Sequence, residues 1–151
     1  MIQKISVSAS KQEGADHFVG QNPEGLQITL DGNKESGKGV TPLECLLLSV
    51  AGCSGADVVD FLKNENDQVS ELKIDVSGWR DKSTAPAPIQ NIAIDYIVIG
   101  EVRESKLKRA VSLSIEKYCA VLKSLNTDVN LDYTVHLNGE KLEIVSELKE
   151  I

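Results

Sequence analysis

Basic residues are under-represented in this sequence. The 151-residue chain has 16 Lys and Arg residues against 23 Asp and Glu residues, which gives a formal net charge of −7 at pH 7. Because proteins bind phosphates through clustered Lys and Arg, this balance argues against a nucleic-acid partner or an anionic membrane. The one basic cluster, Lys106, Lys108 and Arg109, is typical of a solvated helix face.

Long hydrophobic runs are also lacking. Residues Met1 to Ser8 alternate apolar and polar side chains, without the apolar core of a secretory signal. The longest apolar run, Cys45 to Cys53, contains Ser49 and falls well short of the ~20 residues that span a bilayer. We therefore expect a cytoplasmic protein with no membrane helix.

Cysteine and histidine are too few and too widely spaced for a standard metal site. The cysteines are Cys45, Cys53 and Cys119, and the histidines, His17 and His136, are isolated. The cysteine spacings match no zinc-binding pattern, so we expect neither a metal nor a cofactor. Cytoplasmic cysteines are mostly reduced, which leaves catalysis, redox sensing and core packing as their candidate roles.

What the sequence does contain is clear hydrophobic periodicity. Helical periodicity predicts helices over 41–66 and 104–125. The order of strands and helices indicates an α+β fold in a single domain, residues 1–151. Strands are predicted at residues 5–9, 26–30, 72–76, 89–99 and 131–137, and a further short strand begins at residues 17–19. Gly100 is predicted to end the strand at 89–99, and an Asn138-Gly139 hairpin turn follows the strand at 131–137.

The first predicted helix is unusually apolar. Thr41 is a suitable N-cap, Pro42 suits the first helical position, and Glu44 completes a capping box. From Leu43 to Val59 the helix is apolar on nearly all sides, which is typical of a helix buried all round. Six strands and one partner helix can hardly cover it, so we expect a second subunit to do so in a homodimer.

Two glycines inside this helix predict a close approach of the second helix. Gly52 and Gly55 each cost about 1 kcal/mol relative to Ala, which close helix packing would offset. The crossing would bring Cys53 within disulfide reach of Cys119, whereas about 12 Å of helix rise separates Cys53 from Cys45. The expected core-facing residues of the second helix are Leu107, Val111, Ile115, Tyr118, Cys119 and Leu122.

Two long motifs carry a family resemblance. The stretch from Thr41 to Val59, TPLECLLLSVAGCSGADVV, and the stretch from Leu113 to Val121, LSIEKYCAV, resemble the OsmC/Ohr superfamily, closest to its YhfA-like branch. The resemblance implies antiparallel sheets wrapped around two central helices in an intertwined homodimer. It also implies a peroxidase acting on organic hydroperoxides or hydrogen peroxide, with Cys53 as peroxidatic and Cys119 as resolving cysteine. A dithiol, of lipoyl type among the candidates, would reopen the disulfide.

The sequence departs from the family pattern at the residues that activate the reactive thiol. In the peroxidase branches an N-terminal arginine does this, held by a glutamate directly after the helix-starting proline. Here no arginine precedes Cys53, and Glu44 lies one position too late, rotated by about 100° around the helix. Glu44 then suits the capping box better, and Arg80, at the end of a predicted strand, is the candidate replacement for the arginine.

These departures leave a second function open. The chain could be a dimeric protein that binds a small hydrophobic ligand, or a redox sensor with weak or no peroxidase activity. Free cysteines are among the most buried residue types and often serve only in packing. Cys45 fits that packing role.

Overall fold

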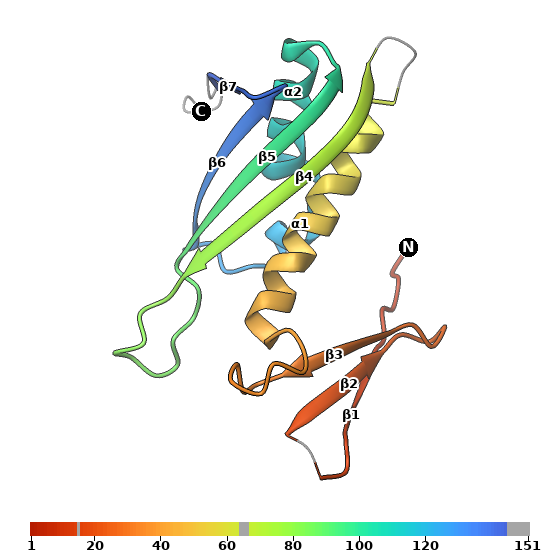
Figure 1. The fold of residues 1–151 in the computed structure, drawn as a ribbon, viewed down its shortest axis with the longest axis vertical. Coiled ribbons are helices and arrows are strands. Elements are labelled where there is room, and N and C mark those ends of the chain that lie inside the picture. The colour runs from red at the N-terminus through yellow and green to blue at the C-terminus, as the bar shows by residue number, and fades with distance from the viewer. Residues whose placement is uncertain (15, 64–66, 145–151) are drawn as a thin grey trace. The chain divides into compact units, whose positions relative to one another are not determined.

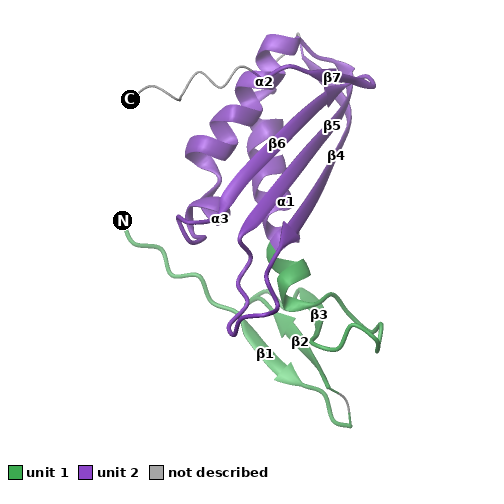
Figure 2. Ribbon diagram, turned by 90° about the vertical axis from the view of Figure 1, so that its left-hand side faces the viewer, with its two compact units in different colours: residues 1–46 green, residues 47–151 purple. Residues whose placement is uncertain are grey.

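The computed structural model describes residues 1–14, 16–63 and 67–144 (Figure 1). The chain divides into two compact units, residues 1–46 and residues 47–151 (Figure 2). Helix α1, Pro42–Phe61, contributes residues 42–46 to the first unit and its remainder to the second. The prediction of a single domain stays a prediction, and each unit is described in turn.

The first unit contains a three-stranded antiparallel sheet. Its strands are β1 (Ser8–Lys11), β2 (His17–Gln21) and β3 (Gln27–Asp31), in the order β1-β2-β3. The three predicted strands are present, but the first begins late, and Ile5 and Val7 are exposed before it. The last residue of β2, Gln21, pairs with Ser8, so β2 offers no partner for an earlier residue.

Helix α1 begins with the predicted capping box. The Thr41 backbone amide donates to Glu44 Oε2 at 2.8 Å, and the Glu44 amide donates to Thr41 Oγ1 at 3.2 Å. These bonds satisfy two amides that a helix start would leave unpaired. The helix ends at Phe61, and its predicted end, Asn66, lies outside the described residues.

The second unit contains a four-stranded sheet in the order β4-β5-β6-β7. Its strands are β4 (Gln68–Trp79), β5 (Asn91–Glu101), β6 (Asn130–Leu137) and β7 (Glu140–Leu142). The predicted Asn138-Gly139 hairpin is confirmed, with φ of 51° at Asn138 and 88° at Gly139. β5 runs two residues past the predicted end at Ile99, through Gly100 to Glu101, so the predicted stop at Gly100 is wrong.

The second sheet is mixed rather than antiparallel. β4 pairs with β5 and β6 pairs with β7 in antiparallel fashion, but β5 and β6 are parallel. A parallel pair needs a crossover, and the helical segment between β5 and β6 provides it. The α+β class is as predicted, and the sheets are antiparallel, as the resemblance implies, except at the parallel pair of β5 and β6. The intertwined homodimer stays a prediction.

The second predicted helix is broken into three pieces. α2 (Glu104–Leu113) passes into a π-helical turn, η1 (Ser114–Tyr118), and a short α3 (Ala120–Lys123) follows. The wider π turn and the break shift the helical register. Tyr118, predicted to face the core, is therefore 48% exposed, while its neighbour Cys119 is fully buried.

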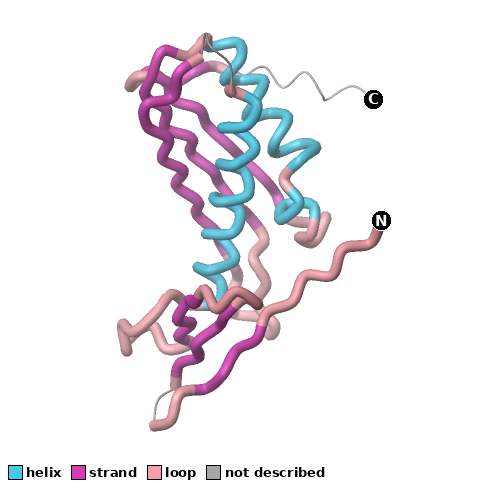
Figure 3. The backbone as a smooth tube through the Cα atoms, turned by 90° about the vertical axis from the view of Figure 1, so that its right-hand side faces the viewer, coloured by secondary structure: helices cyan, strands magenta, loops and turns pink. Residues whose placement is uncertain are grey.

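The core of the second unit lies between its sheet and its helices. α2 and the second-unit part of α1 cover the same face of the sheet (Figure 3). β5 supplies the centre of this core through its alternate residues Ile92, Ile94, Tyr96 and Val98. A hydrophobic core cluster joins them to residues of both helices, among them Val50, Val58, Leu107, Ala110 and Val111.

Helix α1 is buried along one stripe only. Its buried residues, Val50, Ser54 and Val58, are spaced four apart and so share one face. Leu48 and Val59, on other faces, are 55% and 40% exposed. One sheet and one partner helix of the second unit thus leave part of α1 uncovered, as the sequence analysis expected for a single chain, and burial on all sides through a second subunit stays a prediction.

By length and composition alone, α1 could also cross a bilayer. It has 20 residues and a mean hydropathy of 1.4 over its most apolar window. The core helices of globular proteins pass the same test, so this is weak evidence for a membrane span. The expectation of no membrane helix stays a prediction.

Candidate functional site

Cys53 and Cys119 meet in the second unit. Their sulfur atoms and one carboxylate oxygen of Asp57 all lie within 4.8 Å of one another. Cys119 is fully buried, while Cys53 and Asp57 are partly accessible. All three cysteines of the chain are thiols in the structure. The structure thus brings together the two cysteines that the sequence analysis paired.

Local backbone geometry positions the three side chains. Cys53 and Asp57 are one turn apart on α1 and share a face. Cys119 lies where the second helix breaks, with extended backbone angles of φ −64° and ψ 101°, and its amide donates to the Ser114 carbonyl at 2.8 Å. Single π turns in helices occur frequently at functional sites.

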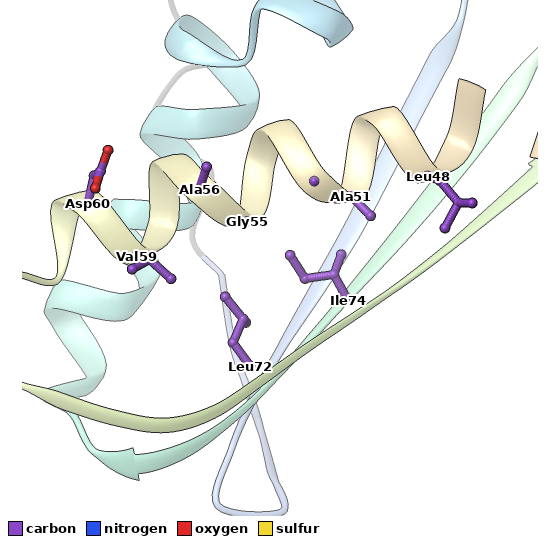
Figure 4. A pocket seen from close by; sticks show the side chains of 9 residues that line it. Leu48, Ala51, Gly55, Ala56, Val59, Asp60, Leu72 and Ile74 are labelled. Atoms are coloured by element: carbon purple, nitrogen blue, oxygen red, sulfur yellow. The ribbon is translucent and has the colours of Figure 1, made fainter. Parts of the chain in front are cut away.

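The two glycines of α1 lie away from this meeting point. A Cβ on Gly52 would meet nothing within 4 Å, and one on Gly55 would meet Ile74 Cδ1 of β4 at 2.9 Å. The prediction that Gly52 and Gly55 admit the second helix is therefore wrong. They line instead an open apolar groove of about 660 Å³ beside α1 and β4 (Figure 4), whose lining residues are Leu48, Ala51, Gly52, Gly55, Ala56, Val59, Asp60, Leu72 and Ile74.

A buried hydroxyl network joins α1 to η1 and β5 beside the cysteines. Ser114 Oγ donates to Asp57 Oδ2 at 2.8 Å and lies 3.0 Å from Ser54 Oγ. Ser54 Oγ is in turn hydrogen-bonded to the Tyr96 hydroxyl. Buried polar groups need such partners, so the network fixes the two helical segments at the point where the sulfurs meet.

Burial controls the protonation of Cys119. Desolvation first, and then the neighbouring Cys53, raise the pKa of its thiol to about 11, against the opposing effect of the Leu122 and Val121 amides. Burial also raises the pKa of Tyr96 to about 12, with the hydrogen bond to Ser54 opposing it. Both groups are therefore neutral at physiological pH.

The raised pKa of Cys119 predicts a loss of stability in alkali. The fold favours the protonated thiol, so its stabilising contribution is complete below the ordinary thiol pKa of 9.0 and disappears as pH rises toward 11. At pH 10 the loss is about 1 kcal/mol, and a Cys119→Ser variant should lack it. Urea unfolding in reductant at pH 8 and pH 10 tests this, and equal losses in both proteins would contradict it.

Glu44 is occupied as a helix-capping residue. Its Oε2 accepts the Thr41 amide, and its Oε1 lies 3.6 Å from Lys34 Nζ. The Thr41 amide is the main cause that lowers the pKa of Glu44, with the Thr41 side chain next. The capping role preferred from the sequence is confirmed, and a role of Glu44 in the site stays a prediction.

Arg80 is exposed directly after β4. Among the described residues, no ion pair or hydrogen bond holds its side chain in place. Nothing in its surroundings distinguishes it from a solvated arginine at a strand end. Its role as the replacement for the family's arginine stays a prediction.

Sequence reasoning missed part of the site. From its place one turn beyond Cys53 in the sequence, Asp57 is predicted to serve in hydrogen bonding or helix packing, and the hydrogen bond from Ser114 confirms this. Sequence reasoning did not place Asp57 beside both sulfurs, nor did it single out Ser54, Ser114 or Tyr96. The sequence pattern that could have indicated these residues is a polar side chain on an otherwise apolar helix face, such as Ser114 among the predicted core positions of the second helix.

Comparisons with known proteins agree with one another. A family model described as OsmC-like protein matches residues 34–134. Protein YhfA of Escherichia coli K12 is 34% identical over 118 residues, covering 78% of this chain and 87% of YhfA. A hypothetical protein from Aquifex aeolicus VF5 is 32% identical with a TM-score of 0.80, over 92% of this chain and 99% of that one. The organic hydroperoxide resistance protein OhrB of Bacillus subtilis is similar in fold, at 20% identity and a TM-score of 0.58, over 89% of this chain and 98% of OhrB.

Proposed function

Because the chain belongs to the OsmC-like protein family, we propose that it reduces hydroperoxides through the thiols of Cys53 and Cys119. The family match confirms the OsmC/Ohr resemblance that the two cysteine motifs carried. Fold neighbours named for organic hydroperoxide resistance support the peroxide chemistry. We also propose a cytoplasmic location, where dithiol reductants, including lipoyl-type ones, are present.

The observation that carries the proposal is the meeting of the two sulfur atoms within 4.8 Å. The raised pKa of Cys119 keeps that residue a thiol at neutral pH, so Cys119 is poorly suited to be the first nucleophile. Cys53 is partly accessible, whereas Cys119 is fully buried. This difference supports Cys53 as the residue that meets the peroxide and Cys119 as the one that follows.

The proposed reaction has three steps. The Cys53 thiolate attacks the peroxide O–O bond, the alcohol leaves with a proton, and Cys53 becomes a sulfenic acid. The Cys119 thiol then attacks the Cys53 sulfur, and the hydroxyl leaves with the Cys119 proton as water, forming a disulfide. A dithiol reductant reduces this disulfide to two thiols and is itself oxidised to a disulfide.

A thiol count after stoichiometric oxidation tests the proposal. One equivalent of an organic hydroperoxide should remove two of the three thiols of the chain, and peptide mass spectrometry should find Cys53 joined to Cys119. Cys45→Ser is the matched control and should form the same disulfide. An unchanged thiol count, or a disulfide that includes Cys45, would rule the proposal out.

We further propose that the protein is a homodimer. The exposed apolar side of α1, including Leu48 and Val59, supports this, because a second subunit would cover it. Native mass spectrometry of the freshly purified protein should give twice the mass of the chain. The mass of a monomer would contradict the homodimer. A dimer carrying a co-purified small molecule would favour the ligand-binding alternative, for which the apolar groove beside Gly52 and Gly55 is the supporting feature.

A further inference from the structure

We propose that Cys53, Cys119 and Asp57 form a binding site for a thiophilic divalent cation such as Zn²⁺ in the reduced protein. The three ligand atoms, two sulfurs and one carboxylate oxygen, lie within 4.8 Å of one another. In a tetrahedral zinc site, ligands at about 2.0 to 2.3 Å from the metal are about 3.4 to 3.8 Å from one another. Side-chain adjustments of about 1 Å therefore suffice to close the set around an ion.

The elements that carry these residues suit a metal site. Cys53 and Asp57 project from adjacent turns of α1, and Cys119 faces them from the break after η1. Ser114 Oγ donates to Asp57 Oδ2 at 2.8 Å, which orients the carboxylate as an outer-shell partner does in known metal sites. Ser114 Oγ is the hydrogen-bond donor found to Asp57 among residues 1–14, 16–63 and 67–144, so the carboxylate keeps the capacity to bind a metal ion.

The charge at the site also favours a cation. In the part of the chain that the structure describes, Asp57 has no ion pair with Lys or Arg, since the ion-paired carboxylates are Glu44, Asp60, Asp67, Asp75 and Glu104. Two thiols and a carboxylate therefore stand together with no ion pair to a Lys or Arg of the described residues. A bound metal ion would supply positive charge there and would deprotonate its thiol ligands.

The ligand chemistry selects the type of metal. Thiolates prefer soft or borderline ions such as Zn²⁺ over Mg²⁺ and Ca²⁺, which prefer oxygen ligands. Three protein ligands leave a fourth position for water in a tetrahedral site. The cysteine spacing matches no zinc pattern and therefore predicted no metal, whereas in this site the fold brings together ligands that lie far apart in the sequence.

Metal binding by these residues does not depend on peroxide reduction, although metal binding and disulfide formation would compete for the same two thiols. The same sulfurs cannot hold a metal ion and form a disulfide at once, so metal binding would protect the reduced pair from oxidation. Both properties could hold, or either could fail alone. Metal binding is therefore measured without peroxide.

The test is a metal titration of the reduced, metal-free, full-length protein under anaerobic conditions. Cd²⁺ should bind at one equivalent per chain and give the ultraviolet charge-transfer band of two thiolate ligands. Zn²⁺ should compete for one equivalent against a chromophoric chelator. An absence of stoichiometric binding, or binding without the thiolate band, would overturn the site. Because this titration uses the unmutated protein, misfolding of a variant cannot explain a negative result.

Variants then test each ligand. Cys53→Ser and Cys119→Ser should each lose the tight site, and Asp57→Asn should weaken Zn²⁺ binding at least tenfold. Asp60→Asn, which changes an exposed carboxylate on the same helix that pairs with Lys63, should bind like the unmutated protein, as should Cys45→Ser. Unchanged affinity in Asp57→Asn, with circular dichroism confirming the fold, would overturn the three-ligand site.

Discussion

Replacement of Cys53 by Ser should lower hydroperoxide consumption to the rate seen without protein, a loss of at least about a thousandfold. A serine hydroxyl at this position lacks a thiolate to attack the peroxide, and Cys119 cannot substitute, because burial raises its pKa to about 11 and keeps it protonated. The measurement is steady-state consumption of an organic hydroperoxide at pH 7 with excess dithiol reductant. Residual turnover in Cys53→Ser that is sensitive to thiol alkylation would contradict the assignment.

The Cys119→Ser variant should accumulate the sulfenic acid on Cys53, whereas the Cys53→Ser variant should not react with peroxide at all. Cys53 would still react once with peroxide, but no neighbouring thiol would remove the sulfenic acid. A dimedone adduct on Cys53 should therefore be found by mass spectrometry in Cys119→Ser and be rare in the unmutated protein. The Cys45→Ser control should resemble the unmutated protein in both assays. Equal dimedone labelling of the unmutated protein, Cys119→Ser and Cys45→Ser would show that Cys119 does not react with the sulfenic acid of Cys53.

Local sequence signals were sufficient for most of the fold. Alternation of apolar residues predicted the strands, and the Thr41, Pro42 and Glu44 pattern predicted the start of α1, because both signals are short-range. The parallel pairing of β5 with β6 and the π turn before Cys119 depend on how distant segments pack. Periodicity along the chain carries no such information.

The site was predictable in its cysteines but not in its surroundings. The meeting of Cys53 with Cys119 was expected from a glycine notch, yet Gly52 and Gly55 face the open groove. The contact runs instead along the Ser54 and Asp57 side of α1, held by hydrogen bonds across the two helices. A polar residue in an apolar helix shows that it needs a partner, but sequence alone does not show which partner the fold supplies.

Pairing and activation of the cysteines are therefore separate physical questions. The hydroxyl network and burial hold the sulfurs together, but none of the groups described around them carries a positive charge. A peroxidase would need a source of positive charge from elsewhere, such as the predicted Arg80, whereas a metal site would need none. A bound cation would supply the positive charge that the described surroundings of the two sulfurs lack.

Replacement of Gly100 by Ala should have the largest effect on stability of any substitution considered, a loss of about 2 to 4 kcal/mol. Gly100 lies in β5 with φ of 153°, opposite an irregularity between Val69 and Glu71 in β4. An added Cβ would lie 2.1 Å from the Gln68 carbonyl oxygen and 3.0 Å from the Ser70 nitrogen. These are backbone atoms, so no side-chain rotation can relieve the clash.

Gly139→Ala separates this clash from simple backbone strain. Gly139 also has a positive φ, 88°, but a Cβ there would meet nothing within 4 Å. Its substitution should therefore cost only about 1 kcal/mol. Chemical denaturation of both variants in reductant gives the comparison. An equal loss of stability in Gly100→Ala and Gly139→Ala would contradict this prediction. It would mean that the backbone of β4 moves away from the added Cβ at little cost, so that the close approach of β4 to Gly100 does not constrain the fold.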